Sequence, residues 1–451
     1  MAVRTSIQTK VSMRRVTTIA SGALVFSLLA ACGGKQAAPE KVIVEEPKIK
    51  DIPGVQPAAM AAFNAGLAKL NQTPKDYVGA LGSFQTAVSQ DPNFWEAVEN
   101  VGLLQIDLAQ YDAAAQTFRE ELRLIEDLAA RGWPVERRVG VHMNLGRALA
   151  LGGRTREAAT EFAKVLEQNP KDVDAKANLA AVYVQEGDFT QARAFIAELL
   201  QANQNEPGAL NVLALIYKRE NNMPMAQYLW EKCTLEIQAK QQALSDEAQY
   251  RDLSEADAER LRRYNETRLV RLSKQLSDVQ NELGVVEAAA KRADQAESFF
   301  KKAVENNPSN SAAYINLGAV YLDYANFADA CSSFEEALAL RPRDLTAMVG
   351  FASCTYGLGE VDAAFAAFER TAQAFPDNAF VAKRLGEIAF RDKNDQATAM
   401  RWFGVNLSIR GTSADVCDQR ADEVCSTLKA LIQMQQSQQP RAPEAGGEEG
   451  K

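Results

Sequence analysis

The apolar positions of the chain recur with the spacing of amphipathic helices. Within residues 313–344, large side chains at Tyr314 and Tyr321 follow a helical period, and a second helical run begins after a turn at Asn326. Pro342 ends the second run, because proline lacks the N–H that a helix needs and clashes with the preceding turn. The pattern therefore predicts two short antiparallel helices.

This two-helix unit repeats about every 34 residues, which is typical of a stacked repeat array. Each copy places a small residue in its first helix and an aromatic residue in its second, where the ring fills the space that the small residue leaves. No segment after Ala58 alternates with the period of a strand, so we expect an all-α body. Clear small–aromatic pairs are Gly66 and Phe84, Gly102 and Phe118, Gly146 and Phe162, Gly284 and Phe300, Gly318 and Phe334, and Gly386 and Phe403.

The repeat resembles the tetratricopeptide (TPR) repeat in about nine copies between Ala58 and Gly411. The resemblance implies an all-α, right-handed superhelical solenoid with a concave groove that binds segments of partner proteins. No single repeat can bury its own apolar face, so neighbouring repeats must stack.

The array is interrupted once, where the helical pattern runs on past the usual end of a repeat. We expect a signal peptide and a tether before the array, one helical insertion within it, and a helix that covers its open end. The expected segments are the signal peptide 1–31, tether 32–57, TPR block 58–234, insertion 235–279, TPR block 280–411, capping helix 412–436 and low-complexity tail 437–451.

The sequence pattern of the insertion predicts two elongated helices. Ser254 and Asp257 have the spacing of a helix-start capping box, and an apolar seam with coiled-coil-like spacing follows. The two helices either form a longer stacked pair or project between the blocks as a docking arm. The seam residues are Leu272, Leu276, Val279 and Leu283.

The N-terminus has the parts of a secretory signal. Arg14 and Arg15 precede an apolar run, Val16–Ala31, which is too short and too polar for a typical membrane span. The run ends at Cys32 in the sequence Leu-Ala-Ala-Cys, which resembles the lipobox of bacterial lipoproteins. Translation from Met13 would give a signal of more usual length.

The lipobox resemblance implies cleavage before Cys32 and lipidation of its thiol and of its new amine. Several acyl chains would anchor the protein stably to a membrane. The residue after the cysteine is Gly33 and not an aspartate, which in lipoproteins of this kind suggests export to the outer membrane. The resemblance therefore implies an outer-membrane lipoprotein, which we expect to face the periplasm.

The formal net charge of the chain is −9. An acidic balance argues against nucleic acid as a partner, because nucleic-acid binding needs a basic face that releases counterions. The negative charge of the body would attract a basic segment of a protein partner through long-range electrostatics.

The sequence offers no catalytic, metal-binding or cofactor-binding motif. His142 is its only histidine and occupies a packing position of the repeat. Gly357 and Gly359 lie in a turn between two helices and not after a strand, so they do not form a dinucleotide fingerprint. We therefore expect neither an enzyme nor a cofactor.

The cysteines other than Cys32 suggest disulfides, because an exported protein meets an oxidising compartment. A bridge between Cys417 and Cys425 requires a turn between them, since eight residues of helix span about 12 Å. Cys331 and Cys354 form an alternative pair, because the TPR resemblance places them on helices that pack together. Cys233 occupies a small, buried position of the repeat.

Asparagines recur at one position of the first repeat helix. Under the TPR resemblance this position faces the groove, where an amide could grip the backbone of an extended peptide through its donor and its acceptor. The positions are Asn100, Asn144 and Asn178 in successive repeats and Asn316 in a later one.

Together these features predict a lipid-anchored scaffold that binds protein partners in a Gram-negative envelope. It resembles outer-membrane TPR lipoproteins of surface machines, with a gliding-motility complex favoured over pilus assembly by the length of the array. The alternative is a regulator or adaptor of peptidoglycan-remodelling enzymes.

Overall fold

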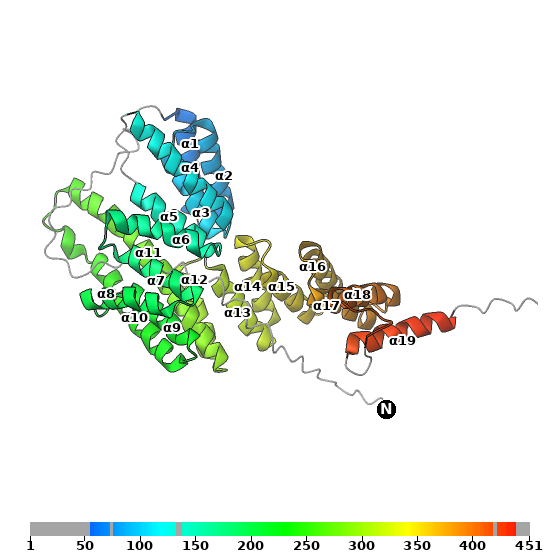
Figure 1. Ribbon diagram of the computed structural model, residues 1–451. Coiled ribbons are helices and arrows are strands. Elements are labelled where there is room, and N and C mark those ends of the chain that lie inside the picture. Colours follow the sequence, from blue (N-terminus) through cyan, green and yellow to red (C-terminus); the bar gives the residue numbers. More distant parts are fainter. Residues whose placement is uncertain (1–54, 73–74, 132–137, 418–421, 439–451) are drawn as a thin grey trace, which may run out of the picture. The chain divides into compact units, whose positions relative to one another are not determined.

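The computed structural model describes residues 55–72, 75–131, 138–417 and 422–438 (Figure 1). The signal peptide, Cys32, most of the tether and most of the tail lie outside these residues. Within them, all regular secondary structure is helical, and eighteen α-helices follow one another as nine pairs before the last helix, α19. This confirms the predicted all-α repeat fold.

The helices form two compact units. Unit 1 extends to Val320 and takes in residues 339–341, and unit 2 comprises residues 321–338 and the chain from Pro342 onward. The predicted division into two blocks around residues 235–279 stays a prediction.

Unit 1 contains twelve complete α-helices, together with the short 3-10 helix η3 and most of α13. In order they are α1 (Pro57–Leu70), α2 (Tyr77–Gln90), α3 (Trp95–Asp107), α4 (Tyr111–Ala130), α5 (Arg138–Leu151), α6 (Thr155–Gln168), α7 (Val173–Glu186), α8 (Phe189–Ala202), α9 (Pro207–Arg219), α10 (Met223–Leu244), η3 (Glu247–Tyr250), α11 (Glu255–Ala289), α12 (Ala293–Asn306) and α13 (Ser311–Asp323).

Unit 2 contains most of α14, the last two complete helix pairs and the final helix. Its helices are α14 (Phe327–Leu340), α15 (Leu345–Gly357), α16 (Val361–Ala374), α17 (Ala379–Arg391), α18 (Gln396–Ile409) and α19 (Glu423–Gln438).

Polar side chains at the helix starts fix where the repeat helices begin. The carboxylate of Asp172 accepts a hydrogen bond from the Ala175 N–H at 2.8 Å, and that of Asp188 accepts one from the Gln191 N–H at 3.0 Å. Gly187 ends α7 with a φ of 84°, a left-handed conformation that glycine adopts without strain. Most of the repeat helices have 13 or 14 residues, so equivalent faces stack from pair to pair.

In five of the six predicted small–aromatic pairs, the aromatic ring lies where a Cβ on the glycine would be. A Cβ at Gly146 would lie only 2.6 Å from the ring of Phe162, which is fully buried. Gly102 has the same relation to Phe118, so glycine is required where the two helices cross. In unit 2, Phe334 lies against Gly350, on the first helix of the next pair.

The two helices of the predicted insertion are α10 and α11, with 22 and 35 residues against 13 or 14 in most of the others. Ser254 caps α11 by accepting the Asp257 N–H at 3.2 Å, as the capping-box pattern predicts.

The second half of α11 does not project from the array. From Leu272 onward its apolar seam is buried in a core cluster that extends back to Ile106 of α3. All four seam residues are 3% exposed or less, because the second half of α11 serves as the first helix of a repeat and packs on α12.

The final helix covers apolar side chains of the preceding one. Cys425, Leu428 and Leu431 of α19 are buried with Phe403 and Leu407 of α18. This packing agrees with the expected capping role, although the helix begins at Glu423 and not near residue 412. Within the described ranges, no helix combines the length and the apolar character that crossing a bilayer demands.

Candidate partner-binding surface

The asparagines predicted to line a groove lie on the expected helices but in different surroundings. Asn100 donates through its side chain to the Glu96 carbonyl oxygen at 2.7 Å and is half-buried, as is Asn144. Asn178 is fully buried, and its Nδ2 lies 3.3 Å from the Met143 sulfur.

Asn178 therefore does not present its amide to a peptide in this structure, because the stacked neighbouring helix covers it. Asn316 donates to the Asn281 Oδ1 at 2.9 Å, across the contact between α11 and α13. Peptide contacts by Asn100, Asn144 and Asn316 stay predictions.

Helix α11 lies opposite the first helices of the N-terminal repeats. Lys274 donates to both carboxylate oxygens of Asp107 on α3, at 2.8 and 2.9 Å. Arg271 lies 3.8 Å from the carboxylate of Asp174 on α7. The surface predicted as a peptide groove is thus spanned by two long basic side chains, which the repeat pattern alone could not reveal.

Arg147 of α5 belongs to the same neighbourhood. We call Asp107, Arg147, Asp174, Arg271, Lys274 and Asp278 the Arg147 cluster. The Nε of Arg147 is buried without a hydrogen-bond partner, and within the described part of the chain no carboxylate lies within ion-pair distance of its guanidinium.

The electrostatics of the cluster follow from its burial. Burial lowers the pKa of Arg147 from its usual value, and the positive charge of Arg271 lowers it further. Burial also raises the pKa of Asp174 to about 7, against the attraction of Arg271, although 20% of its side chain remains exposed.

Neighbouring groups hold this arrangement in place. The side chain of Asn310 donates to Ser277 at 2.9 Å and to Asp278 at 3.0 Å, which fixes α11 to the start of α13. Burial and the charge of Asp107 raise the pKa of Tyr77 to about 12, so its hydroxyl stays neutral at physiological pH. The cluster is therefore a partly buried polar region in which the Nε of Arg147 has no acceptor.

The sole histidine serves a structural contact. His142 Nδ1 lies 2.7 Å from Glu161, and Lys164 lies 2.8 Å from the same carboxylate. Burial by itself would raise the pKa of Glu161, but its hydrogen bonds to these two side chains outweigh burial and lower it. The contact joins α5 to α6, which agrees with the packing role expected for His142.

Two disulfides lie in unit 2. Cys331 and Cys354 are bonded with their Cα atoms 5.5 Å apart, and Cys417 and Cys425 with theirs 6.0 Å apart. The two pairings, which the sequence left as alternatives, are both present. Cys233 belongs to neither disulfide, and its buried thiol donates to the Pro207 carbonyl oxygen at 3.3 Å.

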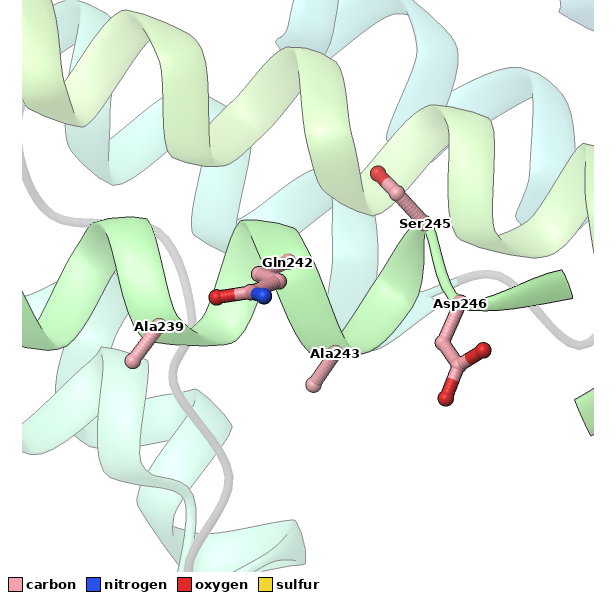
Figure 2. Close-up of a pocket in the computed structure, with 5 residues that line it drawn as sticks. All are labelled: Ala239, Gln242, Ala243, Ser245 and Asp246. Atoms are coloured by element: carbon pink, nitrogen blue, oxygen red, sulfur yellow. The ribbon is translucent and has the colours of Figure 1, made fainter. Parts of the chain in front are cut away.

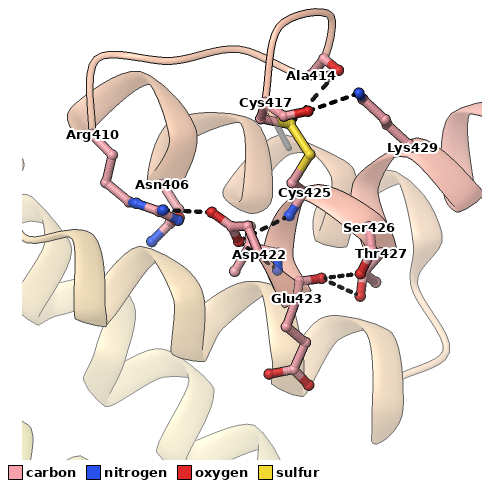
Figure 3. Close-up of a disulfide and its surroundings, with 11 residues drawn as sticks. Asn406, Arg410, Ala414, Cys417, Asp422, Glu423, Cys425, Ser426, Thr427 and Lys429 are labelled. Carbon is pink, nitrogen blue, oxygen red and sulfur yellow. Dashed lines mark hydrogen bonds and ion pairs between the residues drawn. A yellow bond between two sulfur atoms is a disulfide. The ribbon is translucent and has the colours of Figure 1, made fainter. Parts of the chain in front are cut away.

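Figure 3 shows how the second disulfide fixes the start of α19. Asp422 accepts hydrogen bonds from the Val424 and Cys425 N–H groups at 2.9 and 3.2 Å and pairs with Arg410 at 2.5 Å. The hydrogen bond from Arg410 lowers the pKa of Asp422. Lys429 donates to the Cys417 carbonyl oxygen at 3.0 Å, so a hydrogen bond as well as the disulfide ties Cys417 to α19.

An open hollow lies along the exposed side of α10 (Figure 2). Its lining consists of short side chains and Gln242, and its one carboxylate, Asp246, already accepts the Ala248 N–H at 2.9 Å. The hollow therefore lacks the convergent polar groups of a small-molecule site. In the described residues, no group of histidine, cysteine and acidic side chains could hold a metal ion.

Comparison with known proteins agrees with the helix-pair architecture. Residues 149–216 and 315–379 each match a tetratricopeptide repeat family. The chain thus carries TPR repeats, which generally serve as non-catalytic scaffolds for protein partners. No curated protein matches the sequence.

Three solved structures illustrate the range of similar chains. PilF of Pseudomonas aeruginosa is 16% identical over 56% of this chain and 98% of its own, with a TM-score of 0.40. YrrB, a TPR protein with an unusual peptide-binding site, is 15% identical over 52% of this chain and 97% of its own, with a TM-score of 0.37. A human IFIT1 dimer with PPP-AAAA is 14% identical over 85% of this chain and 87% of its own, with a TM-score of 0.44.

Proposed function

We propose that the protein is a lipid-anchored TPR scaffold that binds protein partners in the envelope of a Gram-negative bacterium. The observation that carries the proposal is the presence of two disulfides in an array of TPR-type helix pairs. Disulfides persist in oxidising compartments, so they support export, while the stacked helix pairs support a binding role.

The sequence before the array supports a membrane anchor. Cys32 follows the apolar run at the position where lipoprotein signals are cleaved, and Gly33 favours the outer membrane. Residues 32–57 would then act as a tether of roughly 25–30 Å average span, which would keep the helical body close to the membrane.

A narrower proposal is that the scaffold serves a surface motility machine. It rests on the length of the array, which gives more contact surface than a chaperone for a single subunit requires. A gliding-motility complex is therefore our first choice among envelope machines.

The anchor is tested by Cys32→Ala in the full chain. The variant should lose its lipid mass and leave the outer-membrane fraction, because only the thiol can accept the diacyl group. Ser27→Ala, in the same apolar run, is the control and should fractionate as the unmodified chain does. Outer-membrane recovery of the Cys32→Ala variant would refute the anchor.

The scaffold role is tested by photo-crosslinking in living cells from a reactive residue placed at Tyr264, which is exposed on α11. We expect a specific adduct with another envelope protein. Deletion of the gene for the protein should abolish surface motility. Adducts only with cytoplasmic proteins would refute the envelope scaffold, and normal motility would refute the narrower proposal alone.

A further inference from the structure

The first half of α11 is basic in a chain that is acidic overall. Residues 255–274 hold six basic side chains against four acidic ones, while the formal charge of the whole chain is −9. The acidic total suggests a basic partner, but the charge of the contact surface itself decides which segment can bind there.

Four of the basic residues share one side of the helix. Successive residues of an α-helix turn by about 100°, so positions 3, 11 and 14 residues after Arg260 return to nearly the same direction. The opposite side of the helix carries the buried Ala258, Asn265 and Leu272. We call Arg260, Arg263, Arg271 and Lys274 the basic face of α11.

Arg260 and Arg263, the outer half of the basic face, form only weak ion pairs within their own helix. Arg260 and Arg263 are 50% and 60% exposed and pair only with Asp257 and Glu259 on their own helix, at 3.6 and 3.1 Å. Exposed pairs of this kind contribute roughly 0–1 kcal/mol, so a partner carboxylate could replace them at little cost. Tyr264, 48% exposed beside them, adds an apolar contact.

The inner half of the face leads to the Arg147 cluster. Arg271 and Lys274 reach Asp174 and Asp107, and Arg147 stands between them on α5 with a buried Nε that has no hydrogen-bond partner. A buried guanidinium nitrogen normally donates to an anionic or carbonyl acceptor. An incoming carboxylate would supply that acceptor and relieve the repulsion between Arg147 and Arg271.

We propose that the basic face of α11 and Arg147 bind an acidic polypeptide segment of the partner. The inference rests on the proposed scaffold function and names the chemistry of its partner. The Arg260–Arg263 and Arg271–Lys274 pairs are centred about 16 Å apart along the helix, the span of about five extended residues. The segment therefore carries two acidic groups about five residues apart.

The same charges favour a peptide over a nucleic acid. Asp107, Asp174 and Asp278 lie among the basic groups of the cluster and would repel a continuous phosphate backbone. Separate acidic side chains on a peptide can reach the arginines while its backbone passes these carboxylates.

The test uses the purified chain from Gly33 onward and a fluorescein-labelled peptide, Glu-Glu-Gly-Ser-Gly-Glu-Glu, followed by fluorescence anisotropy. Binding should weaken as salt rises and should be lost when the four glutamates become glutamines. The double variant Arg260→Gln, Arg263→Gln should bind about tenfold more weakly, since each removes one surface charge contact.

The matched control is Arg119→Gln with Arg193→Gln, which removes two partly exposed arginines of unit 1 that pair with Glu157 and Glu220. It changes the net charge equally and should alter binding less than twofold. Arg147→Lys should weaken binding although it keeps the charge, because lysine lacks the planar guanidinium that can bind a carboxylate with two hydrogen bonds. If this variant does not fold, the comparison of the Arg260→Gln, Arg263→Gln variant with its control decides the test.

Equal loss in the double variant and its control would overturn the proposal, as would the absence of peptide binding. Tighter binding of a twelve-residue oligothymidylate than of the peptide would show that the surface is a nucleic-acid site instead. Since this titration needs neither lipid nor the natural partner, its failure would leave the envelope scaffold standing.

Discussion

Units 1 and 2 build on the same helix pair but stabilise it differently. In the described residues, every buried charged side chain lies in unit 1, for example Glu206, Asp278 and Glu282. Both disulfides lie in unit 2, whose buried polar residues are neutral, such as Thr371 and Asn406.

The difference reflects the size of the apolar core. One continuous cluster of unit 1 extends from Ile106 to Val286, whereas the clusters of unit 2 are smaller. A large core can accommodate buried charges that are paired, such as Lys218 and Glu282 at 2.5 Å. A short array has less apolar surface to bury, so cross-links contribute a larger share of its stability.

The largest expected effect on stability comes from removing a buried aromatic ring from the core of either unit. Phe162→Ala in unit 1 and Phe403→Ala in unit 2 each remove a buried ring and should cost about 3–5 kcal/mol. Amide hydrogen exchange should place the loss of protection in the unit that is mutated. A reductant should deepen the defect of Phe403→Ala and leave that of Phe162→Ala unchanged; equal sensitivity would contradict the comparison.

The next effect concerns the disulfides. The 23-residue loop closed by Cys331 and Cys354 predicts about 3.4 kcal/mol of stabilisation, and the 8-residue loop of Cys417 and Cys425 about 2.5 kcal/mol. Serine at both positions of either pair should lower the free energy of unfolding of unit 2 by roughly these amounts. Cys233→Ser is a thiol control in unit 1, and peptide mapping without reductant that finds free thiols at all four positions would refute the bridges.

Much of the fold follows from local sequence. The glycine–phenylalanine register, the buried Cys233 and the Ser254 cap depend on residues within one repeat or one helix start, so their spacing predicts them. The candidate site does not follow in the same way. Lys274 and Asp107 are 167 residues apart in sequence, and their contact depends on how many repeats bring α11 opposite α3.

The asparagines illustrate the same limit. Periodicity places Asn178 on the correct helix but cannot distinguish a residue beside the next helix from one that faces solvent. The signal that could have pointed to the Arg147 cluster is the run of arginines in α11, which a solvent-exposed helix explains equally well.

A smaller effect is the pH dependence of stability that the partly buried Asp174 gives to unit 1. The pKa of Asp174 is raised to about 7 by burial and by Asp172 and Glu206, against Arg271 and Arg147. The unfolded value lies near 4, so between about pH 4 and 7 the folded state holds more protons, and stability falls as pH rises.

Asp174→Asn should remove this decline. Urea unfolding at pH 5 and pH 8 should show the unmodified unit 1 losing at least about 1 kcal/mol relative to the variant, the equivalent of one pKa unit. Glu198→Gln, an exposed control paired with Lys176, should keep the slope. An unchanged slope in Asp174→Asn would show that Asp174 is ionised throughout this range.

The smallest effects come from the asparagines and separate packing from binding. Asn178→Ala removes a fully buried amide and should cost about 1 kcal/mol, because its neighbours lose a polar partner. Asn100→Ala with Asn144→Ala changes two half-buried side chains and should stay within about 0.5 kcal/mol per site. Denaturant midpoints of both variants would measure the difference. If the Asn100 and Asn144 variant recovers less partner at unchanged stability, those two amides belong to the binding surface. If Asn178→Ala does not lower the free energy of unfolding, burial at this position does not contribute to the stability of unit 1. The contrast between the two units would then rest on their charged groups alone.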